Sequence, residues 1–439
     1  MNHAERLDRL PFTGKHMKLL IGSGFGWALD AMDVGLISFI IVQLGVVWNI
    51  DKSTAGWIVS FGFIGMALGA SLGGLLADKI GRRQVFALTL LIYGLATGAA
   101  ALSMSVAVLI LFRFIIGLGL GAELPVASTL MSEFAPAKIR ARLIVVLEGF
   151  WALGWLFAGL IGYFLVPLGT TGWRWALAIG AVPAVYAIVI RAGLPESVRF
   201  LNQKGRTAEA EKIVEEFEAS AKLEPIAPEL GTQQQAQEKT SRIRDLWNAG
   251  LAKRTILISL IWFCVNFSYY GAFIWLPSLL VADGITVTKS FLYYLIITLS
   301  QIPGYACAAF LIEKWGRRPT LALFLAGSAM AAGLFAFAHE PWAIIAAGMT
   351  LSFFNLGAWG ALYATTPELF PTAMRGAGTG LAAGVGRVAS FLTPLLVPAL
   401  MGYGTGVLFA MFGISFLIAC GLTLMLPELK GTSLDQEFH

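Results

Sequence analysis

Long apolar stretches, separated by short polar breaks, recur along almost the whole chain of 439 residues. Each stretch holds about 20 residues, and a helix of that length is long enough to cross the ~30 Å hydrocarbon core of a bilayer. We therefore predict twelve membrane-spanning helices, at roughly residues 19–47, 54–76, 84–103, 106–130, 143–166, 172–193, 255–281, 289–312, 319–337, 341–364, 376–400 and 403–426.

Short charged motifs between these stretches occur twice. They return at a constant distance of 235 positions, since 316 − 81 and 375 − 140 give the same difference. The repeated positions are Gly81-Arg82-Arg83 with Gly316-Arg317-Arg318, Glu133 with Glu368, and Arg140 with Arg375. A repeat of this length indicates two related halves. We predict an all-α membrane protein with two pseudo-symmetric six-helix bundles, residues 1–193 and 254–439, joined by a linker at 194–253.

The linker is the one substantial polar segment between the halves. Within it, Thr207 is expected to cap a helix that runs to Phe217 and keeps its apolar residues on one face. We interpret the segment as a cytoplasmic connector with short amphipathic helices, and a regulatory or partner-binding surface is the alternative.

Composition excludes an ordinary soluble enzyme, because 57% of the residues are hydrophobic and only 13% are charged. Lys and Arg gather in the amino-terminal arm and in alternate short loops, so the positive-inside rule places both termini in the cytoplasm, beneath the inner (plasma) membrane. The same bias explains the net charge of +5, and no nucleic-acid partner is expected. The three cysteines lie in predicted spans, where packing is expected rather than metal binding. No nucleophile–base pair or phosphate loop lies in a water-exposed position, so we expect neither catalysis nor a cofactor.

Several motifs resemble one large transporter family. They are Gly74-x-x-x-Asp78-x-x-Gly81-Arg82-Arg83 after span two, Arg113-x-x-x-Gly117-x-Gly119-x-Gly121 in span four, Pro195-Glu196-Ser197 after span six and Pro427-Glu428 after span twelve. Together they resemble the major facilitator superfamily, in its sugar-porter-like and metabolite:H⁺ symporter branches. The segments Trp27-Ala-Leu-Asp30-Ala-Met-Asp33 and Gly121-Ala-Glu123-Leu-Pro look like those of nicotinate (niacin) transporters. The resemblance covers nearly the whole chain and implies the major facilitator fold.

The loop charges suit a cytoplasmic gate. Carboxylates at helix ends can bond arginines of neighbouring loops while that side is closed, and each partly desolvated bond contributes about 1–3 kcal/mol. The candidate gate residues are Asp78, Arg82, Glu133, Arg142, Arg317, Glu368 and Arg375. Simple anchoring by the positive-inside rule is the alternative.

Each charged residue deep in a span occurs in one half alone, because the residue 235 positions away in the other half is uncharged. Such charges are costly in a membrane, so a function is the default expectation. Asp30 and Asp33 share a helix face, and one of the two is expected to hold a proton. The resemblance implies that Asp33 and Arg113 form the proton-coupling pair, and Glu123 is a further candidate proton site. A static ion pair that holds spans one and four together is the alternative.

Arg387 is the private charge of the second half, about 16 Å along span eleven. Its planar, permanently charged donor fork suits a substrate carboxylate, and a structural partner for Glu148 is the alternative. Aromatic and amide residues of spans seven, eight and ten suit a flat heteroaromatic ring. From these we select Asn266, Tyr270, Asn355 and Trp359 as substrate contacts.

The sequence thus predicts a monomeric, proton-coupled secondary transporter that imports nicotinate or a related small aromatic carboxylate by alternating access. A sugar transporter would share the gate motifs, but Arg387 and the aromatic residues argue against it. An organic-cation or drug exporter would use Asp30 or Glu123 as its cation site. A membrane-embedded sensor without net transport is the third alternative, although nothing in the cytoplasmic segment resembles an output domain. All three alternatives stay open at this level.

Overall fold

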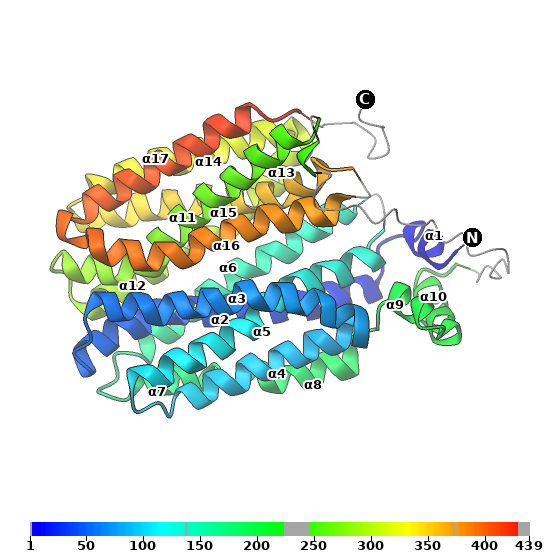
Figure 1. Cartoon of the computed structure of the whole chain (residues 1–439), viewed down its shortest axis with the longest axis horizontal. Coiled ribbons are helices and arrows are strands. Elements are labelled where there is room, and N and C mark those ends of the chain that lie inside the picture. Colours follow the sequence, from blue (N-terminus) through cyan, green and yellow to red (C-terminus); the bar gives the residue numbers. More distant parts are fainter. Residues whose placement is uncertain (1, 137–138, 224–245, 249, 372–373, 429–439) are drawn as a thin grey trace. The chain divides into compact units, whose positions relative to one another are not determined.

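The computed structural model describes residues 2–136, 139–223, 246–248, 250–371 and 374–428, apart from the side chains of residues 78, 124, 125, 141, 375 and 376. Within these ranges all regular structure is helical (Figure 1). Twelve helical segments are long and apolar enough to cross a membrane, which confirms the predicted number. The chain is therefore a multi-pass membrane protein.

The first half forms six spans from seven helices, because its sixth span is divided into two shorter helices. These helices are α2 (Gly14–Val47), α3 (Lys52–Ile80), α4 (Arg82–Ala100), α5 (Val106–Phe134), α6 (Arg140–Phe164), α7 (Gly172–Ile179) and α8 (Val182–Gly193). The second half forms spans seven to twelve. Span eight is divided into two helices, and a short 3₁₀ turn precedes the last helix. Its elements are α11 (Ala252–Ala282), α12 (Val287–Leu299), α13 (Gln301–Trp315), α14 (Arg317–Ala336), α15 (Pro341–Glu368), α16 (Arg375–Leu400), η3 (Met401–Tyr403) and α17 (Thr405–Leu424).

Two prolines explain where the first helix of each divided span ends. A proline lacks an N–H group and its ring clashes with the carbonyl four residues earlier. Pro183 lies four positions after Ile179, the last residue of α7, and Pro303 lies four positions after Leu299, the last residue of α12. The predicted spans 172–193 and 289–312 agree with the candidate spans Gly172–Gly193 and Val287–Trp315, and each of them contains an internal break that the apolar pattern does not show.

The chain divides into two compact units that cut across the helices. Unit 1 comprises residues 1–33, 64–154 and 177–234, and unit 2 comprises residues 34–63, 155–176 and 235–439. Within unit 1, glycines of α3 and α5 bring the two backbones together. A Cβ atom at Gly69 would lie 2.1 Å from the Leu118 carbonyl oxygen, and one at Gly121 would lie 1.9 Å from that of Met66. The predicted bundle limits at 193 and 254 stay a prediction.

Unit 2 contains the ends of α2, α3 and α6 together with second-half helices, and they pack directly. Phe39 of α2 meets Phe291 of α12 edge-on, with 4.8 Å between ring centroids. Ser60 of α3 donates its hydroxyl to the Phe391 carbonyl at 2.9 Å. A Cβ atom at Gly56 would lie 2.4 Å from the Pro394 carbonyl oxygen, so the α3 and α16 backbones touch. We call this contact between the halves the packed end.

Among the described residues, three further α-helices lie outside the spans, namely α1 (His3–Asp8), α9 (Val198–Gln203) and α10 (Thr207–Ser220). The predicted linker helix is confirmed as α10, with Ala210, Val214 and Phe217 buried on one face. The predicted cap was wrong: Arg206 occupies the N-cap position without a side-chain cap bond, and Thr207 is the first helical residue.

Candidate functional site

Asp33 and Arg113 lie together inside unit 1. Arg113 Nη1 is 3.3 Å from Asp33 Oδ2, and the Thr97 hydroxyl donates to the other carboxylate oxygen of Asp33 at 2.9 Å. Asp33 is 1% exposed and Arg113 is 4% exposed, so water does not screen this ion pair. The resemblance implied this pair, and helices α2, α4 and α5 assemble it.

Asp30 has a different set of neighbours from Asp33. Its carboxyl interacts with the carboxyl of Glu123 and with the phenol of Tyr93. All three side chains are buried, and a Cβ atom at Gly26, one turn before Asp30, would lie 3.0 Å from Glu123 Oε1. The sequence predicted that one of Asp30 and Asp33 would hold a proton, and this stays a prediction. The structure places Glu123 of α5 against Asp30, because α5 packs on the face of α2 that carries Gly26 and Asp30.

The Gly-Arg-Arg turn of the first half is closed by two carboxylates. Arg82 Nε forms an ion pair with Glu133 Oε1 at 3.0 Å, whereas the gate role of these two residues stays a prediction. The backbone N–H groups of Arg82 and Arg83 both donate to Glu196 Oε1, at 2.9 and 3.1 Å. Glu196 thus satisfies the amides at the start of α4 and places a negative charge at the helix N-terminus.

The second half repeats this arrangement. Arg317 bonds Glu368 through two nitrogens, at 2.8 and 2.9 Å. The backbone amides of Arg317 and Arg318 donate to Glu428 at 3.4 and 3.2 Å. Gly81 and Gly316 precede these helices with φ of 104° and 105°, a backbone conformation that favours glycine. The internal repeat therefore holds in three dimensions, down to the capping carboxylate. We call the helix ends that carry such a turn the basic end of each half.

The remaining gate candidates are less defined. Arg142 is exposed at the start of α6. Asp78 and Arg375 lie within helices α3 and α16, but their side chains fall outside the described part of the chain. Both observed ion pairs join residues of one half, so they fix each turn to its own bundle.

Arg387 and Tyr270 are brought together in unit 2. Arg387 lies twelve residues after the start of the 26-residue helix α16, hence about 18 Å along it and near its middle. Its side chain is half-buried, and its guanidinium interacts with the Tyr270 hydroxyl on α11. The partial exposure of Arg387 leaves donors for another group.

The predicted aromatic contacts form one connected cluster. Trp359 lies edge-on to Trp262 and Tyr269, with centroids 5.6 and 5.5 Å apart. The ring of Tyr269 is in turn 4.9 Å from that of Tyr270. First-half rings join this cluster within unit 2, since the centroid of Trp155 lies 5.8 Å from that of Tyr269.

The two predicted asparagines differ in their bonding. Asn266 donates to the Trp262 carbonyl at 2.7 Å and accepts from the Ser390 hydroxyl at 2.8 Å, so it ties α11 to α16. Asn355 is fully buried, and neither of its amide atoms has a hydrogen-bond partner among the described residues. A buried amide without a partner is costly, so Asn355 is the better placed of the two to receive a ligand.

Four residues of these sites were not selected from the sequence. Thr97 and Tyr93 are ordinary positions of an apolar span, and only the packing of α4 shows their role. Glu196 and Glu428 carried a usable signal, because a Pro-Glu pair comes directly after both span six and span twelve.

Comparison with known proteins agrees with this architecture. Residues 22–437 match the family model described as sugar (and other) transporter. The niacin transporter NiaP of Acinetobacter baylyi is 45% identical over 99% of this chain and 99% of its own length. A Bacillus subtilis relative that bears the name niacin/nicotinamide transporter NiaP is 43% identical over 95% of this chain and 98% of its own. The partially occluded inward open structure of the xylose transporter XylE from E. coli superposes with a TM-score of 0.76, at 20% identity, over 96% of this chain and 100% of that one. The chain therefore belongs to the sugar (and other) transporter family and has the major facilitator fold.

Proposed function

We propose that this protein imports nicotinate, or a closely related small aromatic carboxylate, together with protons. The observation that carries the proposal is the half-buried Arg387, which interacts with Tyr270 at mid-helix beside an edge-on aromatic cluster. A guanidinium fork binds a carboxylate with two parallel bonds, and aromatic edges suit the face of a flat ring. The niacin transporters to which the chain is similar support the same class of substrate.

The buried charges of unit 1 supply the proton sites in this proposal. Protonation of Asp33 would release Arg113, and the paired carboxyls of Asp30 and Glu123 would carry one proton between them. These groups are 0–4% exposed, which admits a proton but not a quaternary amine. That burial argues against an organic-cation site at Asp30 or Glu123. Moving an anion inward with a proton also cancels the charge that would otherwise oppose an inside-negative potential.

The proposed transport cycle is alternating access by the two halves. By the positive-inside rule the basic end faces the cytoplasm, and the packed end then faces outward in the inner membrane. The Arg82–Glu133 and Arg317–Glu368 pairs belong to the cytoplasmic gate in this scheme. The direct contact of α2 and α3 with α12 and α16 corresponds to a cycle intermediate closed to the outside.

Binding and uptake by the purified protein in proteoliposomes test the substrate. The ligands are nicotinate, nicotinamide, benzoate, a hexose and a quaternary amine, and Arg387→Ala is compared with Arg387→Lys. We expect nicotinate to bind, Arg387→Ala to abolish binding, and Arg387→Lys to retain part of it, because lysine keeps the charge but loses the fork. Equal binding of nicotinamide and nicotinate, or unchanged affinity in Arg387→Ala, would remove the case for carboxylate recognition.

A further inference from the structure

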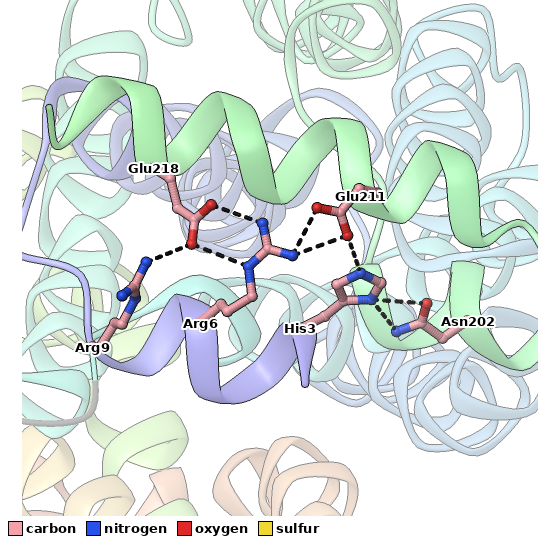
Figure 2. A network of polar contacts seen from close by, with 6 residues as sticks. All are labelled: His3, Arg6, Arg9, Asn202, Glu211 and Glu218. Carbon is pink, nitrogen blue, oxygen red and sulfur yellow. Dashed lines mark hydrogen bonds and ion pairs between the residues drawn. The ribbon is translucent and has the colours of Figure 1, made fainter. Parts of the chain in front are cut away.

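A six-residue helix ahead of the first span binds the linker through a buried charge network. Figure 2 shows α1 lying along α10, with the guanidinium of Arg6 between two glutamates. Arg6 is fully buried and donates to Glu211 at 2.7 and 2.9 Å and to Glu218 at 3.1 and 2.7 Å. Arg9 adds another donor to Glu218 at 2.8 Å. Glu211 and Glu218 are seven residues apart, so they lie on the same face of α10.

His3, the first residue of α1, extends the network to the other linker helix, α9. The His3 ring lies 2.7 Å from Glu211 of α10 and 3.1 Å from Asn202 of α9 (Figure 2). Asn2 and Glu5 cap the start of α1 with reciprocal bonds, which stabilises so short a helix. One face of α1 thus holds α9 and α10 together.

The same arm is tied to the basic end of the spans. Asp8, at the end of α1, forms an ion pair with Arg140, the first residue of α6. After α1, the His16 ring bonds the carbonyl of Phe134, the last residue of α5, at 3.0 Å. Phe217 of α10 contacts both residues, since its ring centroid lies 5.0 Å from that of His16 and 4.8 Å from that of Phe134.

The linker in turn contacts the gate pair of the first half. Ser197, the N-cap of α9, bonds Glu133 through its hydroxyl, and the preceding Glu196 accepts the backbone amides of Arg82 and Arg83. Any displacement of α9 therefore moves two of the groups that orient Arg82 and Glu133.

We propose that α1 is a clip that presses α9 and α10 onto the basic end of the first half, and that Arg6 is a positioning residue for the Arg82–Glu133 pair. Arg6 acts through Glu211 and Glu218 on α10, and through α9 on Ser197. Removing Arg6 leaves the buried carboxylate of Glu218 facing Arg9 alone, a situation that strongly disfavours the packed arrangement. The consequence for uptake rests on the transport function proposed above, whereas the clip itself does not.

Hydrogen exchange of the full-length protein in lipid nanodiscs tests the clip directly. We compare Arg6→Ala with Arg206→Ala, since Arg206 forms an exposed ion pair with Glu209 in the same linker. In Arg6→Ala, the amides of α9 and α10 should exchange faster, on the order of 100-fold, because a buried pair has been broken. Arg206→Ala should exchange like the unmodified protein. If α9 exchanges equally in Arg6→Ala and Arg206→Ala, the clip is refuted.

A second variant separates loss of the clip from general misfolding. Adding Glu218→Gln to Arg6→Ala removes the stranded carboxylate, so exchange of α10 should fall back toward the original rate. A misfolded protein would instead exchange still faster in the double variant, and that result would overturn the assignment of Arg6.

Transport provides the last readout. Arg6→Ala should lower the initial uptake rate of nicotinate by roughly tenfold while its binding affinity stays unchanged. Faster exchange with an unchanged uptake rate would overturn the positioning role. If the unmodified protein takes up no nicotinate, the proposed function fails, and the exchange measurements still decide the clip.

Discussion

Phe39→Ala should shift the protein away from the state closed at the packed end. Phe39 is fully buried on α2 and meets Phe291 and Tyr294 of α12 edge-on, at 4.8 and 5.0 Å between centroids. Each such aromatic contact contributes about 0.5–1.5 kcal/mol beyond area burial, so the two together contribute about 1–3 kcal/mol. Both contacts join the two halves and are lost when this end opens. The ratio of closed to open molecules should therefore fall by about 5- to 150-fold.

Distances between spin labels at this end measure the shift. Lys52 and Lys289 are exposed and belong to unit 2, so each can be replaced by cysteine once the three native cysteines have been changed to serine. Phe335→Ala is the matched control, because Phe335 stacks on Phe409 at 4.0 Å within the second half. Phe39→Ala should add a population with a longer distance, and Phe335→Ala should only lower the unfolding temperature. An unchanged distance distribution in Phe39→Ala, or an equal shift in Phe335→Ala, would refute the reasoning.

Three further predictions concern the charges and turns. Asp33→Asn should abolish pH-driven accumulation while exchange of labelled substrate across the membrane persists, and full accumulation by this variant would contradict the coupling role. Gly81→Ala should unfold at a lower temperature, because its φ of 104° disfavours a side chain and its Cβ would lie 2.5 Å from a carboxylate oxygen, whereas Gly74→Ala, with open space around it, should unfold like the parent. The hydrogen bond from Arg6 lowers the pKa of Glu218 below its ordinary 4.5, so the clip contributes its full stability above that pH and loses it as the pH falls further through the lowered value. Hydrogen exchange of α10 should thus stay slow at pH 6 and speed up only in strong acid, and release already at pH 6 would count against the Arg6–Glu218 bond.

The spans could be predicted from the sequence because a bilayer demands about 20 apolar residues in a row, which is a local property. The breaks at Ile179 and Leu299 were also readable, since Pro183 and Pro303 stand four positions beyond them. Hydropathy averages over such a break and hides it. The partners of Asp30 could not be read in this way, because Glu123 and Tyr93 reach it from α5 and α4 through tertiary packing.

Contacts between segments that lie far apart along the chain also could not be predicted from the sequence. Arg6 and Glu218 are separated by 212 positions, and each by itself resembles an ordinary surface charge. By contrast, the similarity of the turns at Gly81 and Gly316 could be predicted, because the repeat places the same residues at equivalent positions in both halves. Recognition of Glu196 required one more step, a comparison of the residues that come directly after span six and span twelve.

The break after Leu299 has a mechanical consequence. The 13-residue segment α12 carries Phe291 and Tyr294, which meet Phe39, whereas α13 continues beyond Ser300 as a separate helix. The Ser300 hydroxyl is bonded to the Ile297 and Met349 carbonyls at 2.9 and 2.7 Å, so the junction of α12 and α13 is tied to α15. A tilt of the short helix α12 at this point can by itself separate Phe291 and Tyr294 from Phe39. In the proposed cycle, opening of the packed end would then involve movement of α12, while the remaining helices of the second half keep their packing.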